Sequence, residues 1–205
     1  MKLYFAPGTC SLSPQIVIGE LGLEVQLVKV DTKAKKTADG RDFRAINPKG
    51  YVPVLELDDG QYLTEGPVVS QYLADRRPDA GLVPPNGSFE RVRLQEWLCF
   101  ISTEIHKTFS GLFDAKMPEA ARALFKDKLA QRFDFVERAL QAREFLLGTQ
   151  FGVADAYLFT VTRWAPHFDI DLARWPALSA FMRRVEARPA VKAALSTEQA
   201  AKKAA

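Results

Sequence analysis

Apolar residues in the first 75 positions come in short runs separated by turn signals, which is the pattern of strands. Pro7-Gly8 follows the first run, and Asp59-Gly60 precedes the last one. An Asp-Gly pair between two apolar runs is typical of a tight hairpin. The expected strands are residues 2–5, 25–30, 52–57 and 62–63.

Helices are expected between these strands, where proline and glycine mark helix ends. Pro14 suits the first turn of a helix, and Gly22 is a typical residue just past a helix end. Pro67 opens another helix in the same way. Residues 31–43 are polar and predict a loop or a short helix. The order β-α-β-α-β-β-α predicts a small α/β sandwich.

Residues 78–88 have the proline and glycine content of a linker, and the apolar pattern beyond them is helical. Residues 153–165 are apolar nearly all round, as expected of a helix at the centre of a bundle. We therefore expect an α/β domain at 1–77, a linker at 78–88 and an all-helical domain at 89–205, with fraying at 200–205. Two helical faces are carried by Leu94, Trp97, Leu98, Ile101 and Ile105 and by Phe125, Leu129, Phe133, Val136 and Leu140.

Composition narrows the class of protein. The 205 residues are 47% hydrophobic and 26% charged, as in an ordinary globular protein, and the net charge is only +3. The basic residues form no clustered tract, which argues against a nucleic-acid partner. No apolar run approaches the roughly 20 residues of a membrane span, and the N-terminus does not resemble a signal peptide. We expect a cytoplasmic protein with reduced thiols.

Cys10 is the first candidate for chemistry, because it lies between a predicted strand and a predicted helix. Unpaired N–H groups and the positive end of a helix stabilise a thiolate. We therefore expect a thiol pKa below the free value of about 8.5. The C-x-x-S spacing from Cys10 to Ser13 resembles a redox pair that has lost its second thiol. Alternatively, Cys10 is a small buried packing residue.

His106 is the second candidate. It shares a predicted helical stripe with Cys99 and Thr103, and this stripe either lines a cleft or faces solvent. Lys35 and Glu65, taken alone, are ordinary surface charges. Two cysteines and two histidines without close pairing predict no metal site. No glycine-rich phosphate loop and no serine-hydrolase motif are present.

Several segments together resemble a known family over nearly the whole chain. They are residues 1–14 (MKLYFAPGTCSLSP), 47–53 (NPKGYVP), 63–66 (LTEG), 71–75 (QYLAD), 104–107 (EIHK) and 154–159 (ADAYLF). In this order they are similar to bacterial glutathione S-transferases of the beta class. The resemblance implies the glutathione transferase fold: a thioredoxin-like α/β N-terminal domain followed by an all-α C-terminal domain.

The resemblance also implies roles for residues of the first domain. Pro53 would follow a cis peptide bond, and the Val52 backbone would pair with the cysteinyl group of glutathione like an added strand. Lys35 would bind the glycyl carboxylate and Glu65 the γ-glutamyl ammonium. The Gly66 N–H would hold the γ-glutamyl carboxylate at a helix N-terminus.

Further implied contacts come from both domains. Cys10 would face the glutathione sulfur and, with His106, act in catalysis. Thr103 and Glu104 would close the site from the helical domain. Cys99 stands where this family usually has an asparagine that contacts glutathione, so it either contributes a weaker contact or packs between helices.

A second departure concerns stability. Gly152 stands where the family has a serine or threonine that caps the central helix, with Asp155 as its partner. A glycine has no side-chain oxygen to offer. We expect a weaker helix start.

The leading hypothesis is a cytoplasmic, homodimeric detoxification enzyme. It would use the glutathione thiol to attack electrophilic small molecules, aromatic or halogenated ones among them, without a metal. One alternative is glutathione-dependent thiol–disulfide exchange through Cys10. Another is a binding or interaction module that retains the fold without turnover. The residues do not identify the electrophile.

Overall fold

The computed structural model describes residues 1–203, which form two compact units. The sheet unit consists of Met1–Leu82 together with the segment that begins at Ala187, and the helical unit consists of Val83–Glu186. The change from one unit to the other falls inside the predicted linker. The structure therefore differs from the predicted domains at the C-terminal side, where the last segment belongs with the sheet.

The sheet unit contains a five-stranded mixed sheet in the order β3-β2-β1-β4-β5. Strand β1 runs parallel to β2 and antiparallel to β4, while β4-β5 forms the predicted hairpin around Gly60. The short polar strand β3, antiparallel to β2, has no apolar signal in the sequence. The strands are β1 (Lys2–Phe5), β2 (Gln26–Asp31), β3 (Lys36–Thr37), β4 (Val54–Glu56) and β5 (Tyr62–Thr64).

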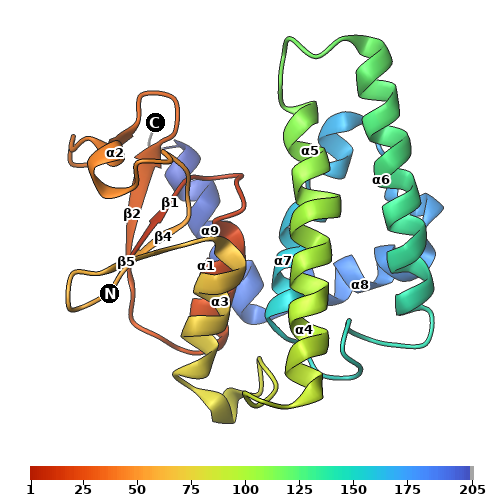
Figure 1. The fold of residues 1–205 in the computed structure, drawn as a ribbon, viewed down its shortest axis with the longest axis horizontal. Coiled ribbons are helices and arrows are strands. Elements are labelled where there is room, and N and C mark those ends of the chain that lie inside the picture. Colours follow the sequence, from red (N-terminus) through yellow and green to blue (C-terminus); the bar gives the residue numbers. More distant parts are fainter. Residues whose placement is uncertain (204–205) are drawn as a thin grey trace. The chain divides into compact units, whose positions relative to one another are not determined.

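Helices of the sheet unit come from both ends of the described chain. Helix α1 packs against both α3 and α9, and Figure 1 shows the blue α9 beside the red α1. One core cluster of this unit lies around Tyr4, Phe43 and Val54, where α2 meets the sheet. The helices are α1 (Leu12–Glu20), α2 (Phe43–Ile46), α3 (Gly66–Asp75), the short 3₁₀ turn η1 (Pro78–Ala80) and α9 (Pro189–Lys203).

Specific contacts explain why α9 joins the sheet unit. The Arg188 guanidinium donates two 2.7 Å hydrogen bonds to the Glu20 carboxylate at the end of α1. Gly19 permits a close approach, since a Cβ there would lie 3.2 Å from the Ala190 Cβ. Such pairings join distant parts of the chain, so the local apolar pattern does not reveal them.

The C-terminal tail is also better held than the sequence predicts. Helix α9 continues to Lys203, and the Ala201 carbonyl accepts a 2.6 Å hydrogen bond from Lys29 Nζ on β2. The predicted fraying from residue 200 is therefore wrong for residues 200–203. Ala204 and Ala205 lie outside the described residues.

The helical unit is built around α7, whose ten residues are all buried, as the sequence predicts. Helix α7 packs against α4 and α8, and α6 packs against α5 and α8. Within Val83–Glu186 the structure contains no β-strand, in agreement with the helical pattern. The elements are α4 (Phe89–Phe100), the π-helix η2 (Ile101–His106), α5 (Lys107–Leu112), α6 (Glu119–Leu140), α7 (Val153–Thr162), the 3₁₀ turns η3 (Ala165–Phe168) and η4 (Leu172–Arg174), and α8 (Pro176–Glu186).

The start of α7 retains half of a capping box. Gly152 precedes the helix and contributes no side-chain bond, as expected, but its N–H donates to Asp155 Oδ2 at 2.8 Å. The other carboxylate oxygen accepts the Leu146 N–H at 2.9 Å. Asp155 is buried, so its carboxylate supports both the helix start and the preceding loop.

Candidate functional site

The turn between β1 and α1 positions Cys10 just ahead of the helix. Ser11 is fully buried, and its hydroxyl lies 3.1 Å from both the N–H and the carbonyl of Ala6. The Ser13 N–H donates to the Cys10 carbonyl at 3.2 Å. These bonds fold the turn back on the strand. They leave the residue Cys10 half-buried, with its Sγ directed inward and 3.4 Å from the Val52 carbonyl, to which it donates.

The expected thiolate at Cys10 is contradicted. Burial raises the pKa of the Cys10 thiol to about 12, and the nearby carboxylates of Glu65 and Glu198 raise it further. The Cys10 backbone N–H acts in the opposite direction but does not compensate. A helix end contributes little once the sulfur is removed from water. Cys10 is therefore a neutral hydrogen-bond donor in this structure.

The Val52–Pro53 segment lies against the start of α3. The peptide bond between these residues is cis, as the resemblance implied. Both residues are buried, and a Cβ on Gly66 would lie 3.6 Å from the Pro53 Cγ, in ordinary contact. Pro53 and the first residue of α3 are therefore neighbours, and Val52 joins this group to Cys10.

Glu65 occupies an unusual backbone conformation at the start of α3. Its φ of 67° lies in the left-handed region, where a non-glycine residue is strained. Its carbonyl accepts the N–H groups of Val68 and Val69 at 2.9 Å. The carboxylate is exposed and forms a 2.6 Å ion pair with Lys49. The strain fixes where the carboxylate leaves the backbone.

Lys35 is held in a similar way. Its φ of 56° is also left-handed, and its carbonyl accepts the Phe43 N–H at 2.8 Å. The Nζ donates to the Gly50 carbonyl at 2.9 Å and lies 5.8 Å from the centre of the Tyr51 ring. Lys35 therefore contacts the segment that leads directly into Val52.

The predicted contacts of the helical unit lie around a π-helix, which the α-helical spacing did not predict. Thr103 and Cys99 are exposed, and the Thr103 hydroxyl donates to the Cys99 carbonyl at 3.0 Å. The exposure of Cys99 contradicts the alternative that it packs between helices. Glu104 accepts a 2.7 Å bond from Arg132 Nε, which lowers the pKa of the Glu104 carboxyl.

His106 is half-buried among aromatic rings, whereas Cys99 and Thr103 of the same predicted stripe are exposed. Its Nδ1 lies 2.6 Å from the Tyr157 hydroxyl, and its ring centre is 5.1 Å from that of Trp164. Trp164 also contacts Phe109 and Phe113 edge to face. The aromatic wall is buried at Phe109 and half-exposed at Phe113, so an oriented imidazole beside it can hold a hydrogen-bonding group next to a flat apolar one.

This aromatic wall was not predicted from the sequence. His106, Phe109 and Phe113 are spaced three and four apart, which on a helix places them on one face. That spacing was the available signal. His167, to which the sequence gave no role, stacks on Phe113 with an angle of 25° between the rings.

Comparison with known proteins decides the family. Models of the glutathione S-transferase N-terminal and C-terminal domains match residues 9–76 and 96–189. Glutathione S-transferase GstA of Escherichia coli O157:H7 is 44% identical over 97% of this chain and 98% of its own length. The chain belongs to the glutathione S-transferase family.

Solved structures of glutathione S-transferases match this structure over nearly the whole chain. The bacterial enzyme BphK, solved as a ternary complex, is 51% identical with a TM-score of 0.96, covering 97% of this chain and 100% of its own. A sphingomonad glutathione S-transferase, solved with glutathione, is 41% identical with a TM-score of 0.95, covering 97% and 99%. The predicted fold is thereby confirmed, and the similarity extends to enzymes of the bacterial beta class.

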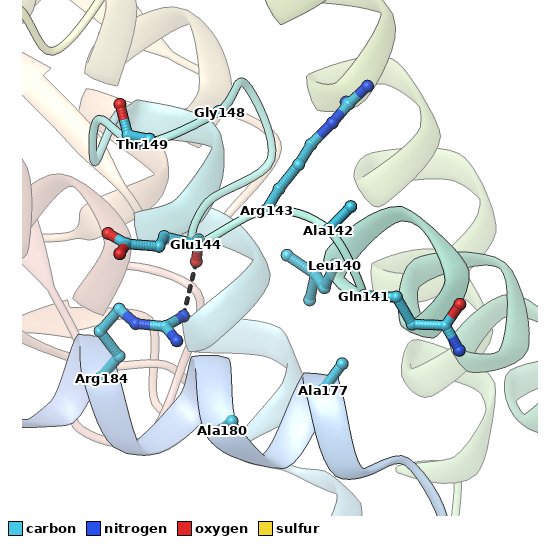
Figure 2. A pocket seen from close by; sticks show the side chains of 10 residues that line it. All are labelled: Leu140, Gln141, Ala142, Arg143, Glu144, Gly148, Thr149, Ala177, Ala180 and Arg184. Carbon is cyan, nitrogen blue, oxygen red and sulfur yellow. Dashed lines mark hydrogen bonds between the residues drawn. The ribbon is translucent and has the colours of Figure 1, made fainter.

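The helical unit of this transferase also has a hollow of about 550 Å³ (Figure 2). The Arg184 guanidinium donates to the Glu144 carbonyl at 2.7 Å there, and Arg143 points away from Arg184. None of the predicted glutathione contacts lines it. The hollow is lined by Leu140, Gln141, Ala142, Arg143, Glu144, Gly148, Thr149, Ala177, Ala180 and Arg184.

Within residues 1–203, no group of three or more histidine, cysteine, aspartate or glutamate residues lies together as a metal ion would need. No helix in the same range has the length and apolar character to cross a membrane.

Proposed function

We propose that this transferase conjugates the thiol of glutathione to electrophilic small molecules, and that Cys10 assists as a protonated donor. The observation that carries this is the Cys10 Sγ, neutral and directed 3.4 Å from the Val52 carbonyl beside the cis bond to Pro53. A bound cysteinyl group that pairs with the Val52 backbone would bring its own sulfur next to that donor.

The sheet unit would hold glutathione along its length. The Val52 backbone pairs with the cysteinyl residue, and Lys35 Nζ binds the glycyl carboxylate. Glu65 binds the γ-glutamyl ammonium, and the Gly66 N–H at the start of α3 binds the γ-glutamyl carboxylate. The contacts that link Cys10, Val52, Pro53 and Gly66, and the bond from Lys35 to the preceding residue Gly50, support this assignment.

The reaction follows from these roles. The glutathione thiol releases its proton to solvent, and the Cys10 S–H donates a hydrogen bond to the resulting sulfur anion. That anion attacks the electrophilic carbon and a C–S bond forms. In a displacement, a halide or similar group leaves with the electron pair of its bond; in an addition, the π bond of the electrophile breaks and the resulting anion takes a proton from solvent. Cys10 keeps its proton throughout, and no metal is required.

Residues of the helical unit would complete the chemistry. We assign His106, oriented by Tyr157, to catalysis as a polar group near the sulfur, and Thr103, Glu104 and Cys99 to glutathione contacts. The half-exposed Phe113 and its aromatic neighbours suit a flat apolar substrate. This supports an aromatic or halogenated electrophile.

We also propose that the enzyme is a cytoplasmic homodimer that acts in detoxification. Light scattering at micromolar concentration would give twice 22.9 kDa for a dimer. A mass of one chain would contradict this part of the proposal.

Turnover assays test the function directly. We expect conjugation of a chromogenic chloronitroarene with glutathione and little reduction of a glutathione mixed disulfide, because disulfide exchange needs a Cys10 thiolate. Faster turnover of the mixed disulfide would favour the oxidoreductase alternative. Glutathione binding by calorimetry with no turnover of either compound would favour a binding module.

A further inference from the structure

The turn of residues 47–51 supplies the internal partners of two predicted glutathione contacts. Lys35 Nζ donates to the Gly50 carbonyl, and Glu65 Oε1 accepts from Lys49 Nζ at 2.6 Å. Lys49 Nζ also donates to the Thr64 hydroxyl at 2.8 Å. One short turn thus contacts the groups proposed for opposite ends of the peptide.

The turn itself is well fixed. The buried Asn47 donates from Nδ2 to the Tyr51 carbonyl at 2.7 Å and accepts the Lys49 N–H at 3.2 Å. The Gly50 N–H donates to the Asn47 carbonyl at 2.8 Å. The backbone from which the Lys49 side chain departs is therefore held in place, and only the four-carbon stem of the lysine needs to move for its ammonium to leave.

The Gly50 carbonyl on Lys35 can stay in place when a ligand binds, whereas the Lys49 ammonium on Glu65 competes with the ligand. An ammonium has three donors, so Lys35 can keep the Gly50 carbonyl and still bind a carboxylate. Glu65 instead carries an ammonium where the ligand would place its own ammonium. Two cations on one carboxylate repel each other, so the ammonium of the ligand competes with that of Lys49 for Glu65. Lys49 is 46% exposed and can move into solvent.

We infer that Lys49 is a specificity-determining residue that occupies the γ-glutamyl ammonium position until glutathione exchanges its own ammonium for it. This inference rests on the proposed binding of glutathione at Glu65. The exchange replaces one ammonium by another, so the carboxylate is paired in both states. A peptide without a free α-ammonium cannot make the exchange and leaves Lys49 in place. The lysine therefore reduces what the ligand gains from its ammonium.

The test compares glutathione with N-acetylglutathione, which lacks the ammonium, by calorimetry on the wild-type protein and on Lys49→Met. Exposed ion pairs contribute about 0.2–1 kcal/mol, so the affinity ratio of glutathione to N-acetylglutathione should rise by about 1.5- to fivefold in Lys49→Met. The increase comes from the glutathione side, because its ammonium no longer competes with a lysine.

Lys33→Met is the matched control. Lys33 is exposed on the polar segment before Lys35, so its loss removes the same charge from the same unit. N-acetylglutathione carries one more negative charge than glutathione, and this control measures how far that difference alone changes the ratio. We expect no comparable rise in Lys33→Met.

The outcomes separate the two proposals. An unchanged or lower ratio in Lys49→Met, or an equal rise in Lys33→Met, overturns the role of Lys49 while glutathione binding stands. No glutathione binding by the wild-type protein overturns the proposed function itself.

Discussion

In the sheet unit, backbone geometry holds the predicted site residues, whereas in the helical unit neighbouring side chains hold them. Glu65 and Lys35 have left-handed φ angles, and Pro53 follows a cis bond. His106, by contrast, is oriented by Tyr157 and Trp164, and Glu104 by Arg132. Backbone placement is stiff and changes little with side-chain identity, while side-chain placement is lost with one partner. Loss of one side-chain partner should therefore displace a site residue of the helical unit, whereas the site residues of the sheet unit should keep their placement.

The largest expected effect concerns the protonation of Cys10. In a Cys99→Ser background, which removes the exposed thiol, the alkylation rate of Cys10 should keep rising with pH well past 9, because burial raises the pKa to about 12. The raised pKa also makes the free energy of unfolding depend on pH. This free energy should fall only above pH 9.0, the ordinary pKa of the thiol, because the unfolded state then releases the Cys10 proton while the folded state keeps it. If the alkylation rate instead reaches its midpoint at or below about pH 8.5, Cys10 is a reactive thiolate and the neutral-donor role is wrong.

Asp155→Ala should produce the largest loss of stability. Removing the carboxylate leaves the buried N–H groups of Gly152 and Leu146 without this partner, at a cost of about 3 kcal/mol in the free energy of unfolding. Urea unfolding measures it. Asp127→Ala on the exposed face of α6 is the control and should stay within about 0.5 kcal/mol. A similar small effect for Asp155→Ala would show that side chains matter less in this unit than we argue.

The donor role of the Cys10 S–H can be tested with Cys10→Ala and Cys10→Ser. Loss of the S–H removes a hydrogen bond to the glutathione anion, so kcat/KM for conjugation should fall about tenfold in Cys10→Ala. Cys10→Ser keeps a donor and should recover most of the loss. If alanine and serine lower the rate equally, sulfur chemistry at this position is required and the donor role fails.

Cys99→Asn gives the smallest expected effect. Cys99 is exposed, and an amide both donates and accepts better than a thiol. Glutathione should bind about two- to tenfold more tightly in Cys99→Asn. Calorimetry measures the change, and Lys107→Gln on the next helix serves as an exposed control. An unchanged dissociation constant would mean that Cys99 does not contact the peptide.

Much of the fold follows from local signals in the sequence. Asp59 and Gly60 predicted the hairpin, and the apolar residues 153–165 predicted the central helix. The π-helix at Ile101–His106 was not predictable, because its sequence satisfies an ordinary helix and only packing decides the extra residue per turn.

In the candidate site too, some features were predictable from the sequence and others depend on how distant segments pack. The family motifs located Cys10, Pro53 and Glu65, but the protonation of Cys10 depends on how deeply the fold buries its sulfur. The pairing of Lys49 with Glu65 depends on two turns meeting, and no local pattern encodes that.

The placement of α9 has a consequence for how the protein is made. The ribosome synthesises the whole helical unit before Pro189–Lys203, so the sheet unit cannot be completed until its last helix has been made. During that interval Glu20 lacks Arg188, and the Gly19 surface of α1 is uncovered. The sheet unit, although most of it is translated first, is therefore the unit that is completed last.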